Sequence, residues 1–197
     1  GAVVAHVSGN TGALVEVNCE TDFVGRNEVF QRFAGEVARA IAASRANSVD
    51  EFLAEKWPGS DEPVSQKVAE QIVKRVAGKV PVVMHIGTAN TYSSIELAKH
   101  AASLGVDAIG VVPPYYYPHD DYEVYAHYKS IAKSVPGVPL FIYDNTETTW
   151  VEITPAKANK IIEAIAPNPL AGIKVSFIAY DKLLGYVYQL PKSTGVF

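Results

Sequence analysis

The strongest constraint on the fold is the regular alternation of apolar runs and amphipathic segments after about residue 66. Four apolar runs are expected to be buried strands: 80–86, 106–112, 138–143 and 170–175. Segments with helical spacing of apolar residues separate these runs, which recur about every 30 residues, the length of one βαβ unit. Continuous apolar strands that alternate with helices are typical of a helix-covered parallel sheet or of a barrel. The sequence therefore predicts an α/β fold.

Helix-capping residues place the helices of this part. Ser93 and Glu96 are expected to cap one helix, and Thr154-Pro155 to open another with a favoured cap and a first-turn proline. Further helices are expected over 121–133 and from about Ile178. A complete barrel needs about 250 residues and eight strands, so four strands predict a half barrel with two open edges. Open edges promote association, and we therefore expect a homo-oligomer.

The beginning of the chain follows a different pattern. Residues 3–7 and 13–18 flank the turn-rich stretch 8–12 (Ser-Gly-Asn-Thr-Gly), which predicts a β-hairpin. Apolar residues at three- and four-residue spacing then predict an amphipathic helix over about 27–44. The first part is thus expected to be a small α+β module.

A short helix and a linker are expected to follow this module. Ser48 and Glu51 form a candidate capping box for a helix that ends at Pro58-Gly59. Proline, glycine and polar residues dominate 58–65, which is the best linker of the chain by composition.

Composition restricts the classes of partner. The 197 residues are 48% apolar and carry a formal charge of −4 without a basic run, which argues against a nucleic-acid partner or an anionic membrane surface. No apolar run approaches the ~18 residues of a membrane span. Cys19 is the only cysteine, which excludes an intramolecular disulfide and favours a reducing, cytoplasmic setting. Because the histidines lack metal-ligand spacing with carboxylates, and no phosphate-binding glycine loop is present, we expect no cofactor.

Lys174 is the residue best suited to covalent chemistry. It lies near the C-terminal end of the run 170–175, and reacting groups of barrel enzymes collect at that face. Apolar walls would lower the pKa of a lysine there, so that the neutral amine can attack a carbonyl. Tyr143 ends the preceding strand, where its phenol could shuttle the protons of imine formation. In the structural alternative, which spacing alone favours, Lys174 only extends to solvent and Tyr143 is a rim aromatic.

From about Gln66 onward the sequence resembles the dihydrodipicolinate synthase and N-acetylneuraminate lyase family. The matching motifs are His-Ile-Gly-Thr-Ala-Asn at 85–90, Pro-Tyr-Tyr-Tyr-Pro at 114–118, the helix segment 125–132, Tyr-Asp at 143–144 and Gly-Ile-Lys at 172–174. The resemblance implies an aldolase-type TIM barrel and a class I, Schiff-base lyase acting on pyruvate or another 2-oxo acid. It further implies that Lys174 forms the imine, that Tyr143 relays protons and that Tyr116 completes the relay. The Tyr-Tyr-Tyr-Pro form is closer to the sialic-acid lyase and sugar-acid aldolase branches.

Three features depart from the pattern of this family. The Gly-Thr-Thr loop, which holds the pyruvate carboxylate in the family, has no match in the barrel-like part. The turn at 8–12 is similar in composition, but it lies in the expected hairpin. Val-Ser-Phe at 175–177 replaces the commoner acidic sequence after the lysine, and the strands after the sixth have no counterpart.

Residues 12–24 (Gly-Ala-Leu-Val-Glu-Val-Asn-Cys-Glu-Thr-Asp-Phe-Val) resemble the signature stretch of translation elongation factor Ts. The resemblance spans about 1–57 and implies a guanine-nucleotide exchange module that binds elongation factor Tu. Asp22 and Phe23 would then act on the partner's nucleotide-binding G domain. The family's N-terminal helical module and second core subdomain have no match. The residues alone favour a structural alternative, in which Asp22 caps the next helix, Phe23 packs beneath it and Cys19 is a small buried hydrophobe.

Together these patterns predict two domains. Residues 1–60 would form an elongation factor Ts-like hairpin–helix module, and 61–197 a partial dihydrodipicolinate synthase-like barrel of about four βα units. The first functional hypothesis is a Schiff-base lyase or aldolase centred on Lys174. The second is an exchange module centred on Asp22 and Phe23. The third is a chimeric or truncated chain without activity.

Overall fold

The structure, a computed structural model, describes the following residues: 1–17, 25–76, 78–176 and 179–197. Within these ranges the chain divides into two compact units, Gly1–Gln71 and Ile72–Phe197. Helix α4 (Val64–Val76) spans the division between the units. The domain boundary predicted after residue 60 stays a prediction.

The first unit begins with the predicted hairpin. β1 (Ala2–Ser8) pairs antiparallel with β2 (Thr11–Val17), so the hairpin prediction is confirmed. Gly9 and Asn10 form the connection, and Gly9 has a φ of 59°, a left-handed conformation that glycine adopts without steric cost. Helix α2 (Glu28–Ala43) packs against both strands.

The start and the apolar stripe of α2 follow from local sequence. Asn27 is its N-cap, and the Asn27 side chain accepts a hydrogen bond of 3.0 Å from the amide of Val29. Asn27 is therefore the cap of α2, while Asp22, the cap expected in the structural alternative, lies outside the described residues. The predicted apolar stripe is confirmed, because Val37 is buried and belongs to the same core cluster as Phe52.

Helix α3 (Val49–Ala54) shows half of the predicted capping box. The Ser48 hydroxyl accepts a hydrogen bond from the amide of Glu51 at 3.1 Å. The Glu51 carboxylate, however, accepts from the amide of Asn47 at 2.8 Å instead of returning to Ser48. The predicted end at Pro58-Gly59 is wrong, since the backbone turns to an extended conformation directly after α3.

The segment 58–65 is an ordered turn of the first unit rather than a free linker. The amide of Trp57 donates to the carbonyl of Glu62 at 2.8 Å, and the amide of Val64 donates to the carbonyl of Glu55 at 2.8 Å. These backbone hydrogen bonds hold both ends of the segment together. The segment is therefore ordered, although its composition is typical of a linker.

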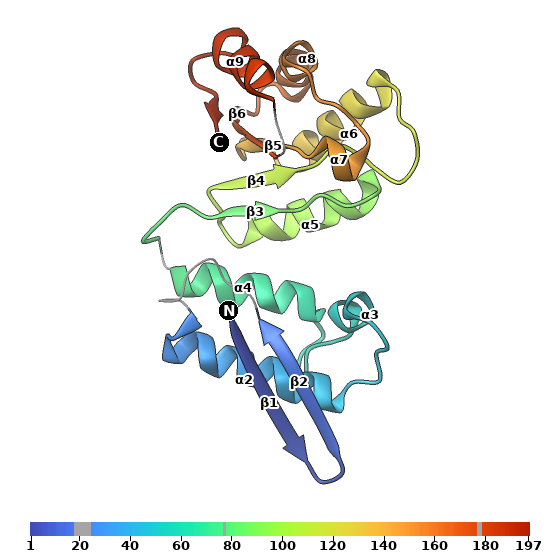
Figure 1. Cartoon of the computed structure of the whole chain (residues 1–197), viewed down its shortest axis with the longest axis vertical. Helices are drawn as coiled ribbons and strands as arrows, with labels where there is room; N and C mark the ends of the chain where they lie inside the picture. The colour runs from blue at the N-terminus through green and yellow to red at the C-terminus, as the bar shows by residue number, and fades with distance from the viewer. Residues whose placement is uncertain (18–24, 77, 177–178) are drawn as a thin grey trace. The chain divides into compact units, whose positions relative to one another are not determined.

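The second unit contains a parallel sheet of five strands in the order β3-β4-β5-β6-β7 (Figure 1). The strands are β3 (Val83–His85), β4 (Ala108–Val111), β5 (Leu140–Asp144), β6 (Leu170–Val175) and β7 (Gly195–Val196). The helices that alternate with them are α5 (Thr91–Ser103), α6 (Asp121–Ser134), the short α7 (Thr146–Thr149), α8 (Pro155–Ile165) and α9 (Tyr180–Gln189). The predicted α/β class is confirmed.

The sheet has one strand more than the four predicted. β7 comprises only Gly195–Val196, and two residues are too few to give a periodic signal. The run 80–86 forms a strand only at Val83–His85, where β3 has a single neighbour among the described residues. Pro81 has no amide hydrogen and limits pairing at the start of this run.

Capping explains where two of these helices begin. The N-cap of α5 is Asn90, whose side chain accepts from the amide of Ser93 at 2.9 Å, so the predicted cap of Ser93 with Glu96 is wrong. Asparagine is a strong N-cap, and its position three residues earlier starts the helix sooner. Thr154-Pro155 opens α8 as predicted, with the Thr154 hydroxyl accepting from the amide of Lys157 at 3.2 Å.

The two faces of the sheet differ in burial. Strand residues on the helix-covered side are fully buried, among them Ile109, Leu140, Ile142 and Ile173. Their sequence neighbours point to the other side, because side chains alternate along a strand. Phe141 and Tyr143 there are partly exposed, and Lys174 is exposed. This open face carries the candidate site.

Candidate active site

Strands β5 and β6 bring Lys174 and Tyr143 side by side. The two residues are direct partners in the parallel ladder, and the Lys174 Nζ lies 3.7 Å from the centroid of the Tyr143 ring. An ammonium group at this position is attracted by the negative face of the ring. The sheet register therefore places an amine beside a phenol.

The expected desolvation of Lys174 is wrong for the described residues. Its side chain is exposed, because α5, α6, α8 and α9 cover the opposite face of the sheet. The close neighbour of the Lys174 amine on this open face is the Tyr143 ring.

Tyr143 receives support from the residue two positions after Lys174. The Ser176 hydroxyl donates a hydrogen bond of 3.3 Å to the Tyr143 phenol oxygen. The pKa of Tyr143 lies below its usual value. This hydrogen bond is the main cause, and the Lys174 ammonium is the next. Both groups stabilise the phenolate, which can then accept a proton from a neighbouring amine.

His85 is the third titratable group of the open face. Its ring lies edge-on to the Tyr143 ring with the centroids 5.9 Å apart. Desolvation of the imidazole, followed by the charge of Lys174, lowers the pKa of His85 below its usual value. The imidazole beside the phenol is therefore harder to protonate than a solvated histidine.

Sequence reasoning did not select His85 or Ser176 as site residues. His85 lies one residue before the end of the predicted strand 80–86, and Tyr143 is the last residue of the predicted strand 138–143, so a position near a strand end was the available signal. Ser176 follows Lys174 at the two-residue spacing that places side chains on one side of an extended strand. Neither signal shows which strands are neighbours, so the sheet order was needed.

Two aromatic rings lie against Gly172 of β6, two residues before Lys174. The Phe141 and Phe197 rings lie 5.8 Å apart. A Cβ atom added to Gly172 would stand 2.5 Å from Cε1 of Phe141 and 2.9 Å from Cε2 of Phe197. Gly172 is therefore required for the rings to lie against β6.

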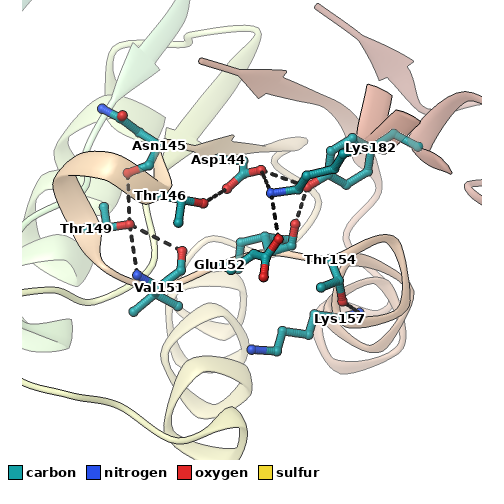
Figure 2. Close-up of polar contacts among 11 residues, drawn as sticks. Asp144, Asn145, Thr146, Thr149, Val151, Glu152, Thr154, Lys157 and Lys182 are labelled. Carbon is teal, nitrogen blue, oxygen red and sulfur yellow. Dashed lines mark hydrogen bonds and ion pairs between the residues drawn. The ribbon is translucent and has the colours of Figure 1, made fainter. Parts of the chain in front are cut away.

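A buried carboxylate lies directly after Tyr143 at the end of β5. Figure 2 shows Asp144, which is 3% exposed, with Thr146 and Lys182 directed at its two oxygens. The Lys182 Nζ lies 2.8 Å from Oδ2, and the Thr146 hydroxyl donates to Oδ1 at 2.9 Å. The Tyr186 hydroxyl also donates to Oδ2 at 2.8 Å and contacts the carbonyl of Ile153.

This network ties α9 to the end of β5. Lys182 and Tyr186 belong to α9, and one turn of helix separates them, so both reach the same carboxylate. Burial, together with the hydrogen bond to Asp144, raises the pKa of Tyr186 well above its usual value. Lys182 also lies 3.4 Å from the Glu152 carboxylate. The arrangement holds the strand end that carries Tyr143.

Tyr116 does not join this constellation in the described residues. It is 81% exposed, and its described ring contact is with Tyr117 at 5.0 Å between centroids. Its φ of 85° is strained for a residue with a side chain, and such conformations cluster at functional sites. Tyr116 borders an open hollow of about 710 Å³ that is lined in part by His119 and His127.

The described residues contain neither a cluster of metal ligands nor a helix long and apolar enough to cross a membrane. Residues 1–17, 25–76, 78–176 and 179–197 contain no group of three or more His, Cys, Asp or Glu side chains arranged to hold a metal ion. His119 instead contacts Glu123 at 3.3 Å, and Asp120 forms a complete capping box with Glu123 at the start of α6. None of the helices described has the length and apolar character needed to cross a bilayer.

The candidate residues of the other unit lie outside the described residues. These are Asp22 and Phe23, the proposed contacts with elongation factor Tu, and the single cysteine, Cys19. Their assignments stay predictions.

The parallel βα sheet carries a lysine and a tyrosine at adjacent strand ends, and barrel enzymes carry their reacting groups at the same end of such strands. The chain belongs to the dihydrodipicolinate synthetase family, whose sequence model matches residues 61–197. Residues 1–60 lie outside this match, and their likeness to elongation factor Ts stays a prediction.

Individual relatives agree with this assignment. The chain is 45% identical over 102 residues to the 4-hydroxy-tetrahydrodipicolinate synthase of Kosmotoga olearia, which covers 52% of this chain and 33% of that protein. It is 31% identical over 105 residues to the N-acetylneuraminate lyase of Salmonella paratyphi A, which covers 53% of this chain and 35% of that protein. The sialic acid aldolase of Ruminococcus gnavus superposes with a TM-score of 0.63 at 27% identity over 70% of this chain and 45% of that one. The matched part thus spans about a third of the length of the curated relatives.

Proposed function

We propose that the second unit acts as a class I lyase or aldolase that forms a Schiff base with pyruvate or another 2-oxo acid through Lys174. The observation that carries this proposal is the 3.7 Å approach of the Lys174 Nζ to the Tyr143 ring at adjacent strand ends. A reactive lysine needs a nearby proton acceptor and donor, and the phenol can serve as both. The similarity to an N-acetylneuraminate lyase and a sialic acid aldolase supports the choice of reaction class.

The proposed reaction begins with proton transfer from the Lys174 ammonium to the Tyr143 phenolate. The neutral amine attacks the carbonyl carbon of the 2-oxo acid, which forms a C–N bond and an alkoxide. Proton transfers through Tyr143 convert this adduct to a carbinolamine, whose C–O bond then breaks with loss of water. Two protons of the original ammonium group leave in that water, and the third remains on the iminium nitrogen. The lowered pKa of Tyr143 brings the phenol closer to the pH at which it can exchange protons.

Tyr116 is the third proposed member of the proton relay. Because it makes no described contact with Tyr143 or Lys174 within the chain, its participation requires a homo-oligomer in which Tyr116 of one copy approaches Tyr143 of another. Its exposure and its strained φ of 85° support a role that is completed by association.

Trapping with borohydride tests the proposal directly. The protein is incubated with pyruvate and borohydride, and intact mass and peptide mapping locate any reduced imine. We expect one adduct, on Lys174, and none in Lys174→Ala. Lys133→Ala removes an exposed lysine of α6 and is the matched control, which should label normally. Labelling spread over several lysines, or undiminished in Lys174→Ala, would contradict the proposed function.

A further inference from the structure

We propose that Ser176 is a positioning residue for Tyr143, which holds the phenol oxygen toward Lys174 and favours its ionised form during imine formation. The inference rests on the proposed function of Lys174 and Tyr143 and adds a residue to that site. The contact that carries it is the 3.3 Å hydrogen bond from the Ser176 hydroxyl to the Tyr143 oxygen. Because this bond uses the serine proton, the phenol oxygen is the acceptor, and a donated hydrogen bond stabilises the ionised form of the acceptor more than its neutral form.

The backbone holds Ser176 in place for this contact. The Ser176 amide donates to the carbonyl of Asp144 at 3.1 Å, which continues the β5–β6 ladder one residue beyond the strand. Asp144 is itself anchored through its carboxylate to Lys182 and Tyr186. The serine hydroxyl is therefore carried by a backbone position that two strands and α9 define together.

The charged and titratable groups around the phenol come from two elements. β6 contributes Lys174, whose Nζ lies over the ring, and β3 contributes His85, whose ring lies edge-on. Among the described hydrogen bonds, Ser176 supplies the side-chain hydroxyl that reaches the phenol oxygen. This hydrogen bond is the largest cause of the lowered pKa of Tyr143, and Lys174 is the next.

Ser176 belongs to the same pair of neighbouring chain segments as the other two groups. Lys174 and Ser176 lie two residues apart on one side of the same chain segment, with Tyr143 opposite them on β5. One rigid strand pair thus fixes the nucleophile, the proton carrier and the donor that supports the carrier. A loop from another part of a barrel is not needed for this hydrogen bond.

Nuclear magnetic resonance titration of tyrosine labelled at the ring carbon next to oxygen measures the ionisation of Tyr143 without substrate. The resonance is assigned by its loss in Tyr143→Phe, since the chain has 11 tyrosines. In Ser176→Ala we expect the titration midpoint of Tyr143 to rise toward that of free tyrosine, and in Ser176→Thr to stay unchanged. Ser134→Ala, which removes a hydroxyl bonded only within α6, is the control.

The rate of imine trapping with pyruvate and borohydride is the second readout. We expect Ser176→Ala to slow trapping on the order of tenfold, because it removes part of the 10²–10⁴-fold that a proton-transfer group contributes, and Ser176→Thr to restore the rate. Circular dichroism checks folding, and Ser176→Cys, a weaker donor of similar size, replaces the alanine variant if that variant unfolds.

The two readouts separate failure of the inference from failure of the proposed function. Normal trapping on Lys174 with an unchanged Tyr143 midpoint and rate in Ser176→Ala would overturn the role of Ser176 alone. Absence of trapping in the unmutated protein would overturn the proposed function, and the catalytic role of Ser176 with it, even where the titration midpoint moves. A raised midpoint with slowed trapping, both reversed by threonine, supports the inference.

Discussion

Replacement of Asp144 should destabilise the second unit more than replacement of any exposed carboxylate. Asp144→Ala removes the acceptor for Tyr186 and the close partner of Lys182, whose side chain is only 21% exposed. Loss of one partner of a buried ion pair costs about 3–5 kcal/mol, because the other charge stays in a poorly solvated place. Asp144→Asn keeps the shape and part of the hydrogen bonding, so we expect about 1–3 kcal/mol.

The matched control is the second carboxylate near Lys182. Glu152 lies 3.4 Å from the same Nζ but is 56% exposed, so Glu152→Gln should cost less than about 1 kcal/mol. The double variant Asp144→Asn with Lys182→Met removes both charges. It should recover much of the loss seen in Asp144→Asn, since neutral replacement of a whole buried pair is often tolerated.

Urea unfolding followed by fluorescence measures these differences. The chain has two tryptophans, Trp57 in the first unit and Trp150 in the second, so a Trp57→Phe background leaves Trp150 as the reporter. The free energy of unfolding is compared among the variants at constant pH. Equal losses for Asp144→Asn and Glu152→Gln, or a loss below about 1 kcal/mol for Asp144→Ala, would refute the reasoning, because the buried network would then contribute little.

Three further predictions follow from other features. Burial lowers the pKa of His127 to about 4 from its usual 6.5. Because the unfolded chain then binds a proton more readily than the folded one, about 3 kcal/mol of stability should be lost as pH falls from 6.5 to 4. The free energy of unfolding should therefore fall less between pH 7.5 and pH 4.5 in His127→Gln than in the unmutated chain. The open edges of β3 and β7 should promote self-association, and light scattering that reports a monomer at high concentration would contradict this. If the first unit acts on elongation factor Tu, the chain should accelerate GDP release and Phe23→Ala should abolish the effect, whereas an unaccelerated rate with the unmutated chain would exclude that activity.

Local sequence determined the secondary structure and the position of the reactive residues along their strands. The apolar runs predicted the strands that became β4, β5 and β6, and Thr154-Pro155 predicted the start of α8. These features depend on side-chain periodicity and on capping within one turn of helix, so neighbours in sequence decide them. Local pattern failed where Asn90 capped α5 three residues ahead of Ser93, because both polar residues are suitable N-caps and sequence did not show which one starts the helix.

Tertiary structure alone decided which strand ends meet and which face of the sheet stays open. Lys174 and Tyr143 are 31 positions apart, and only the parallel register of β5 with β6 makes them partners. Ser176 entered the site through the same pairing, whereas His85 belongs to β3, which β4 separates from β5, and the buried charge of Asp144 is compensated by Lys182 of α9. The exposure of Lys174 likewise depends on which face the helices cover, a property of packing between elements distant in sequence. Sequence by itself determined the kind of chemistry that the strand ends could carry, and the fold determined which groups stand close enough to take part.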